Sequence, residues 1–182
     1  MKRTVFFLMI LALLSVGVAE EALAQTCPSI SGPHSWGPRY WFDYAIAPGC
    51  YTTSGVSSIT SSCGFGAWSL GNSSASFSFT VGSQVLDATK WTASTRIYFN
   101  DTNNSNGNWV YFAVNVTHPN TTVTQYPIVS WSGTDGDITG CALSSGTFTA
   151  NTGDVVEVLV LSQAAVGSPT ISVEYPSITN DQ

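Results

Sequence analysis

The amino-acid sequence predicts an all-β protein, a two-sheet antiparallel β-sandwich of jelly-roll or immunoglobulin-like type, with a Greek-key barrel as the alternative. Three observations support this fold class. Apolar and polar residues alternate with a period of two from about residue 75 onward. No stretch after residue 24 carries an amphipathic helical repeat. Gly, Ser, Thr, Asn and Pro recur at short intervals, as they do in turns between short strands.

Each predicted strand is a run of β-branched or aromatic residues between turn residues. The alternation is clearest where Phe77 and Phe79 flank Ser78. The run DVVEVLVL at 154–161 is apolar on both faces apart from Glu157, which is typical of a central strand. We expect strands at residues 39–46, 66–70, 75–81, 84–87, 95–99, 109–116, 127–131, 141–143, 146–149, 154–162 and 170–175.

The start of the chain has the order of a secretory signal peptide. Lys2 and Arg3 precede an apolar run at 5–18, and the small-residue triplet at 22–24 precedes Gln25. The apolar run is shorter than the roughly 20 residues of a membrane-spanning helix. The sequence therefore predicts a signal peptide at 1–24, a single domain at 25–182, no membrane insertion, and a secreted protein that is extracellular, periplasmic or on the cell surface.

The charge balance excludes two classes of partner. The chain has 5 basic and 11 acidic residues, and beyond the predicted signal peptide the basic ones are Arg39, Lys90 and Arg96. So few cations cannot neutralise a row of phosphates or hold an anionic membrane surface. We therefore expect no nucleic-acid partner. The polar surface consists of Ser, Thr, Asn and Gly, which suits a neutral, hydroxyl-rich partner.

Four cysteines, Cys27, Cys50, Cys63 and Cys141, follow the predicted cleavage site. An exported protein meets an oxidising compartment, so we expect two disulfides. The sequence allows three connectivities. Loop closure favours Cys50 with Cys63, because glycines mark turns nearby, and this leaves Cys27 with Cys141.

The segments around residues 97 and 112 are interpreted as one antiparallel hairpin. Alternation predicts an inward face and an outward face on both strands. The expected register places Tyr98 opposite Tyr111, and the connection at 100–108 is longer than the roughly two to five residues usual in hairpins. The inward set is Ile97, Phe99, Val110, Phe112, Val114 and Val116.

The outward residues of this hairpin are the candidate ligand-binding residues: Arg96, Tyr98, Trp109, Tyr111 and Asn115. Aromatic rings can accept the C–H face of a sugar, and amide groups can bind its hydroxyls. Outward aromatic residues can equally be strand formers covered by a neighbouring loop. The leading hypothesis is a secreted, non-catalytic module that binds a glycan or another hydroxyl-rich surface polymer.

The aromatic segment near the N-terminus supports a second hypothesis, a structural or adhesive cell-surface subunit that self-associates by pairing strand edges. The oligomeric state is not predicted. A second binding face is one interpretation of this segment. An edge strand with a plug that closes one end of the core is the favoured one. The aromatic residues are Trp36, Tyr40, Trp41, Phe42 and Tyr44.

No cofactor or metal is expected, although calcium has candidate oxygen ligands in two loops. They are Asp135 and Asp137 in one loop and Asp101 with Asn103 in the other. Neither loop has the glycine and the closing glutamate of the twelve-residue calcium loop, and turn chemistry explains both.

A secreted hydrolase is the third hypothesis. Glu157 and Glu174 are the glutamates beyond the signal peptide, and a glycosidase needs two facing carboxyl groups. His118 is a histidine without a G-x-S-x-G motif anywhere in the chain. The segment WSGTDGD at 131–137 is similar to the W-x-G-x-D-G stretch of the secreted glutamic peptidases, but the catalytic Gln and Glu contexts of that family are absent. The sequence leaves catalysis open and favours binding.

Overall fold

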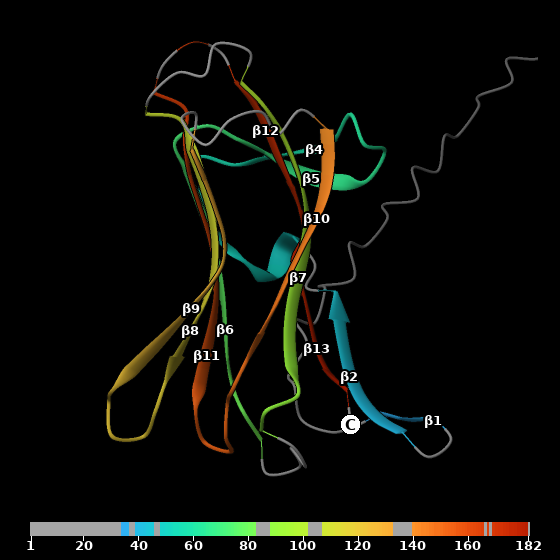
Figure 1. Cartoon of the computed structure of the whole chain (residues 1–182), viewed down its shortest axis with the longest axis vertical. Coiled ribbons are helices and arrows are strands. Elements are labelled where there is room, and N and C mark those ends of the chain that lie inside the picture. The colour runs from blue at the N-terminus through green and yellow to red at the C-terminus, as the bar shows by residue number, and fades with distance from the viewer. Residues whose placement is uncertain are drawn as a thin grey trace, which may run out of the picture.

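The computed structural model describes residues 34–36, 39–45, 48–82, 88–101, 107–132, 140–165, 167 and 169–181, with the backbone alone before Gly49. These residues form two antiparallel sheets packed face to face (Figure 1), which confirms the predicted β-sandwich. The predicted signal peptide and the predicted strand at 84–87 lie outside the described residues. Among the residues described, no helix is long and apolar enough to cross a membrane.

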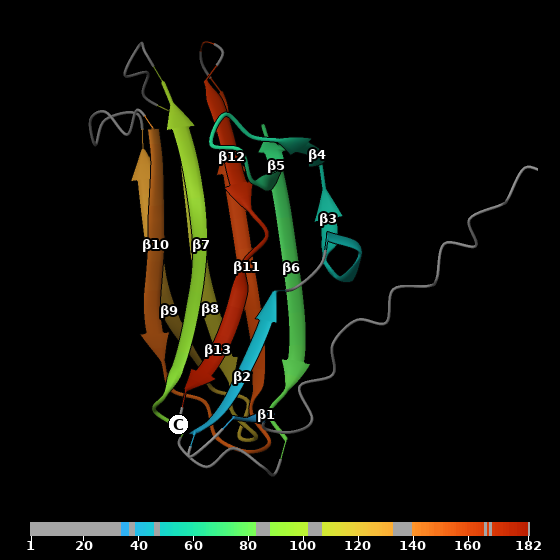
Figure 2. The ribbon, with the colours of Figure 1, turned by 90° about the vertical axis from the view of Figure 1, so that its right-hand side faces the viewer.

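Sheet A is the larger layer. Its strands follow the order β1-β2-β13-β7-β12-β5-β4, and β10 pairs with the other edge of β7. Figure 2 shows this sheet from outside, with β10 on one side of β7 and β13 on the other. The strands are β1 (His34–Trp36), β2 (Arg39–Ala45), β4 (Ser57–Thr60), β5 (Gly66–Leu70), β7 (Trp91–Asn100), β10 (Gly140–Phe148), β12 (Thr170–Glu174) and β13 (Ser177–Asp181).

Sheet B has five strands in the order β3-β6-β11-β8-β9. The strand β11 (Val155–Gln163) lies between β6 (Ser73–Thr80) and β8 (Trp109–Thr117), as its apolar sequence predicts. The edges are β3 (Thr52–Ser54) and β9 (Val123–Ser132). A single 3-10 turn, η1 (Pro48–Cys50), precedes β3 among the described residues.

The core fills the space between the two inner faces. Trp91 and Phe148 stack with their ring centroids 5.7 Å apart. The indole N–H of Trp91 donates to the Ala150 carbonyl at 3.1 Å, so burial leaves no donor unpaired there. The six residues predicted to point inward are each at most 2% exposed, which confirms the inward set.

The predicted hairpin is wrong. The strand β7 belongs to sheet A and pairs with β10, β12 and β13, whereas β8 belongs to sheet B and pairs with β11 and β9. Alternation is a property of each strand alone, so it identifies inward residues without identifying the partner strand. The long segment between β7 and β8 connects the two sheets.

Two of the predicted strands form a single strand, and four further strands were not predicted. The segments 141–143 and 146–149 form one strand, β10, which runs through Gly146. A Cβ atom at Gly146 would lie 2.7 Å from Ile128 Cδ1, so the glycine allows close approach of β9. The strands β1, β3, β4 and β13 were missed, because the first three have only three or four residues and β13 has one apolar residue, Ile178. The predicted aromatic edge strand is β2, which pairs with the outermost strand β1.

Candidate functional site

The five candidate ligand residues are divided between the two outer faces of the sandwich. Arg96 and Tyr98 alternate with the buried Ile97 in β7, so both point outward from sheet A. The other three, Trp109, Tyr111 and Asn115, lie in β8 and belong to sheet B. The predicted platform with Tyr98 opposite Tyr111 is therefore not formed, because these residues lie in different sheets.

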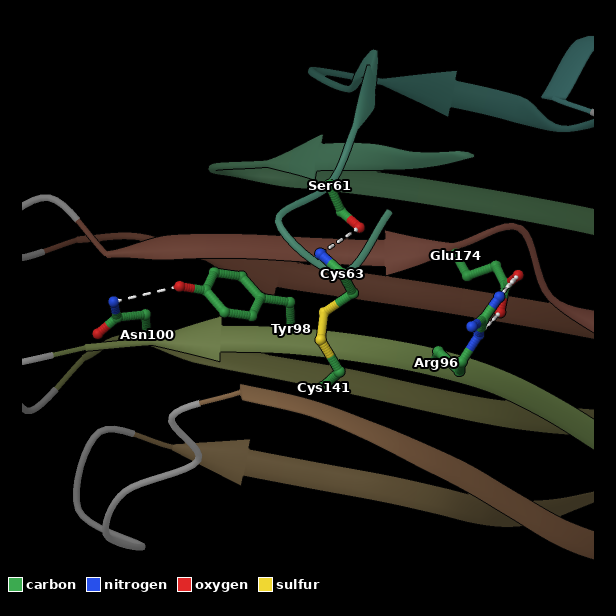
Figure 3. The surroundings of a disulfide bond; sticks show 7 residues. All are labelled: Ser61, Cys63, Arg96, Tyr98, Asn100, Cys141 and Glu174. Atoms are coloured by element: carbon green, nitrogen blue, oxygen red, sulfur yellow. Dashed lines mark hydrogen bonds and ion pairs between the residues drawn. A yellow bond between two sulfur atoms is a disulfide. The ribbon is translucent and has the colours of Figure 1, made fainter. Parts of the chain in front are cut away.

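A short segment covers part of the outer face of sheet A. Residues 61–65, named here the strap, form a tight turn in which the Gly64 N–H donates to the Ser61 carbonyl at 2.9 Å. A disulfide between Cys63 and Cys141 fixes the strap to β10, with 5.9 Å between the Cα atoms. Figure 3 shows the strap crossing above β12. In β12, Ser172 is 1% exposed although it lies opposite the outward Tyr98.

This disulfide corrects the expected connectivity. The pairs Cys50–Cys63 and Cys27–Cys141 are both wrong, because Cys63 bonds Cys141 across 78 residues of sequence. Cys50 is also disulfide-bonded, which agrees with the expectation that the cysteines are oxidised. Short-loop closure misled the prediction because β10 and the strap meet only through the tertiary fold.

Arg96 contacts both Glu174 of β12 and Phe65 of the strap. Its Nε and Nη2 groups donate to Oε2 and Oε1 of Glu174, each at 2.7 Å, and this bidentate hydrogen bonding raises the pKa of Arg96. The guanidinium also lies 4.5 Å from the ring centroid of the buried Phe65 in the strap. Tyr98 lies beside the disulfide in Figure 3, and its hydroxyl accepts a hydrogen bond from Asn100 at 3.3 Å. Both residues are thus engaged within the protein.

The outer face of sheet B has a different character. In Figure 1 sheet B forms the left-hand layer, no described element lies outside it, and β8 and β9 bend outward at both ends. The residues Trp109, Tyr111 and Asn115 of β8 lie opposite Gln163, Leu161 and Glu157 of β11. We name the sheet B face as the set Trp109, Tyr111, Asn115, Gln125, Glu157, Leu159, Leu161 and Gln163.

Aromatic groups occupy one part of the sheet B face. The rings of Trp109 and Tyr111 are half-buried, so each lies against its neighbours and keeps an exposed surface. The indole N–H of Trp109 donates to Gln163 Oε1 at 2.8 Å, which restrains the ring. This arrangement offers two partly exposed aromatic rings, of which the Trp109 ring is restrained by a hydrogen bond.

A hydrogen-bonded polar chain occupies the neighbouring part. Gln125 Nε2 donates to Asn115 Oδ1 at 3.0 Å, and Asn115 Nδ2 donates to Glu157 Oε2 at 2.9 Å. This series of hydrogen-bonded side chains crosses three adjacent strands, β9, β8 and β11. The three side chains are therefore already oriented before any ligand arrives.

Sequence reasoning missed Gln125 and Gln163 and gave Glu157 no binding role. All three are polar residues within strands, and this was the available signal. They could not be grouped with Asn115 and Trp109 because the neighbours of β8 were unknown. Pairing with β11 and β9 brings them together.

The two glutamates considered for catalysis do not face each other. Glu157 lies on the outer face of sheet B, whereas Glu174 pairs with Arg96 on the outer face of sheet A. They cannot act on one glycosidic bond as the two carboxyl groups of a glycosidase do.

His118 connects two turns at one end of the sandwich. Its Nδ1 lies 3.0 Å from Oδ1 of the buried Asp154, and its Nε2 lies 3.1 Å from the Thr124 hydroxyl. Asp154 Oδ2 also accepts from the Asn151 N–H at 2.8 Å. The carboxylate and the imidazole thereby join the turn after β8 to the turn before β11.

The calcium candidates are only partly described. Asp135, Asp137 and Asn103 lie outside the described residues. Asp101 is buried, and its Oδ2 accepts a hydrogen bond from Asn108 at 2.9 Å. Within the described part of the chain, no group of three His, Cys, Asp or Glu residues could hold a metal ion.

No protein-family model and no curated protein matches this chain. Among solved structures, the chain is similar to the CBM22-1 and GH10 modules of endo-1,4-beta-D-xylanase 10B from Clostridium thermocellum, complexed with xylohexaose. The TM-score is 0.48 with 12% identity, over 72% of this chain and 26% of that one. This chain therefore spans about a quarter of that protein's length.

The CBM22-1 xylan-binding domain of Paenibacillus barcinonensis Xyn10C is also similar, with a TM-score of 0.48, 12% identity, and coverage of 72% of this chain and 85% of that one. A further xylan-binding domain of CBM family 22 has a TM-score of 0.48 and 10% identity, over 74% of this chain and 88% of that one.

Proposed function

We propose that this protein is a secreted, non-catalytic β-sandwich module that binds carbohydrate through the sheet B face. One observation carries the proposal: two aromatic side chains, Trp109 and Tyr111, lie beside a preorganised polar chain on a face that no described element covers. Aromatic rings accept the C–H face of a sugar ring, and amide and carboxylate groups bind its hydroxyls.

The composition and the oxidised cysteines are consistent with this role. Sheet B contains no Lys or Arg in its five strands, so a phosphate-rich polymer finds no complementary charge there. A disulfide such as Cys63–Cys141 forms and persists in the oxidising conditions that exported proteins meet. A neutral polymer outside the cell is a partner that fits both properties.

Calorimetric titration with soluble oligosaccharides tests the proposal. The first probes are xylohexaose, chosen because a similar solved structure contains it, and cellohexaose and mannohexaose as neutral alternatives. Replacing Trp109 by Ala should remove about 1.5 to 3 kcal/mol of apolar contact, which is a loss of roughly ten- to a hundredfold in affinity.

The matched control is Tyr98→Ala, which removes an outward ring from the opposite face. This variant should bind as tightly as the unchanged protein at a temperature where both are folded. The proposal fails if no glycan binds at millimolar concentration. It also fails if Trp109→Ala binds normally.

A further inference from the structure

We propose that Glu157 makes the sheet B face selective for neutral glycans. Its carboxylate would accept hydrogen bonds from neighbouring sugar hydroxyls and would repel glycans that carry carboxylate or sulfate groups. This inference rests on the proposed carbohydrate-binding function and adds the class of ligand that the face accepts.

The position of Glu157 supports the first half of the inference. Glu157 lies in the middle strand of sheet B, opposite Asn115 of β8 on one side and Ser78 of β6 on the other. A group at this position can reach any ligand that lies across the strands. Leu159 lies between it and the part of the face that carries Tyr111 and Leu161, so a ligand that reaches both parts spans roughly 13 Å along the strand.

The hydrogen bonds of Glu157 leave acceptor capacity for a ligand. Its Oε2 accepts from Asn115, and Asn115 is itself held by Gln125. Among the described residues, no hydrogen bond is made to Oε1. A carboxylate has about four acceptor sites, and hydrogen bonds to an ionised acceptor are roughly twice as strong as neutral ones. Glu157 can therefore bind sugar hydroxyls while it remains fixed by Asn115.

The charge distribution supports the second half. The five strands of sheet B contain one acidic residue, Glu157, and no basic residue. Nothing in these strands offsets its negative charge, and the whole chain has a net charge of −6. An anionic glycan on this face would meet repulsion without a compensating cation. A glutamine would keep the acceptor for Asn115, so the charge itself is the feature that discriminates between glycans.

A structural role alone makes a different prediction. If Glu157 only positions Asn115, Glu157→Gln keeps that acceptor and should change the affinity for neutral and acidic glycans by the same small factor. If it also selects by charge, replacement should change neutral and acidic glycans in opposite directions. Whether the affinities for neutral and acidic glycans change in the same or in opposite directions therefore separates the two roles.

The test compares glycans of one backbone with and without acidic groups. The pairs are xylohexaose with a xylo-oligosaccharide carrying a glucuronic acid side group, and hydroxyethyl cellulose with carboxymethyl cellulose. We expect Glu157→Gln to weaken the neutral member roughly fivefold, from loss of the charge-assisted hydrogen bonds. We expect it to strengthen the acidic member about threefold in 10 mM salt, where the Debye length is about 30 Å.

Salt and a matched variant complete the experiment. Raising salt to about 0.15 M shortens the Debye length to about 8 Å, so it should strengthen acidic-glycan binding by the unchanged protein more than by Glu157→Gln. Glu174→Gln makes the same change in net charge on the opposite face and should leave the ratio of neutral to acidic affinity unchanged.

A second variant keeps the test decisive if Glu157→Gln folds poorly. Glu157→Asp retains the charge and shortens the side chain, so it should weaken neutral glycans and still exclude acidic ones. The inference is overturned if the ratio of affinities stays constant in Glu157→Gln, or if Glu174→Gln changes it equally. If the unchanged protein binds neither member of any pair, the proposed function fails as well. If it binds both members equally, only the role of Glu157 fails.

Discussion

The two outer faces of the sandwich use similar side chains for different purposes. Each face carries an outward tyrosine, Tyr98 on sheet A and Tyr111 on sheet B. On sheet A the tyrosine lies beside the strap and the Cys63–Cys141 disulfide. On sheet B the tyrosine lies on a face that no described element covers, beside Trp109.

The polar groups also differ between the two faces, because those of sheet A pair with each other and those of sheet B leave one acceptor without a hydrogen bond from the described residues. Arg96 and Glu174 bind each other through two hydrogen bonds, so the two charges on this face are paired within the protein. The chain from Gln125 through Asn115 ends at Glu157, whose Oε1 accepts no hydrogen bond from another described residue. An outward aromatic residue therefore indicates a binding site only where the structure leaves its face uncovered.

The largest expected effect comes from releasing the strap. Replacing both Cys63 and Cys141 by Ala removes a cross-link between residues 78 apart in sequence, which should cost about 4 kcal/mol in the free energy of unfolding. Urea unfolding followed by tryptophan fluorescence measures this loss. Glycan binding at low temperature should persist in the folded fraction, because the sheet B face contains neither cysteine. A stable but non-binding variant would contradict this division of the faces.

A smaller effect is expected from the apolar contact of the strap. Phe65 is 5% exposed and lies under Arg96, so Phe65→Ala should destabilise the fold by about 3 kcal/mol. The control on sheet B is Leu161→Ala, which truncates a half-buried side chain and should cost about 1 kcal/mol. Thermal melts of both variants compare the faces. Equal losses would mean that the sheet B face is also covered.

The two outward tyrosines should separate stability from binding. Tyr98→Ala should lower the free energy of unfolding by about 2 kcal/mol, because Tyr98 packs beside the disulfide and accepts from Asn100. Tyr111→Ala should cost less than about 1 kcal/mol and should weaken glycan binding. Chemical unfolding and titration of the same two samples make the comparison. The assignment of faces fails if Tyr98→Ala is the variant that loses binding.

The smallest effect concerns Tyr51, which lies between the sheets and contacts Trp68 of sheet A and Phe77 of sheet B. Burial raises the pKa of Tyr51 well above 10.0 in the folded protein. The unfolded chain would ionise Tyr51 near its ordinary pKa, so this residue contributes stability that is present below about pH 10 and is lost as the pH rises further.

Tyr51→Phe should remove this part of the alkaline loss of stability. At neutral pH the variant should lose about 1 kcal/mol, because the hydroxyl donates to the Pro176 carbonyl at 3.3 Å. Urea midpoints measured between pH 7 and pH 11 give both quantities. An unchanged slope above pH 10 would show that Tyr51 has no part in the alkaline transition.

The sequence by itself determined the fold class and the direction of most side chains. Alternation along a strand follows from backbone geometry, so Ile97 and Phe112 could be assigned to the core, and Arg96 and Tyr111 to the outside, without knowing which strands pair. The oxidised state of the cysteines could also be inferred, because it depends on compartment more than on fold.

Only the tertiary structure decided which strands are neighbours and which outward residues share a face. Strand pairing joins residues far apart in sequence, and β7 pairs with β10 and β13 while β8 pairs with β11 and β9. The same pairing brings Cys141 under Cys63 and separates Tyr98 from Tyr111. Parity within a strand is a local property, whereas a binding face and a disulfide depend on non-local contacts that no single strand encodes.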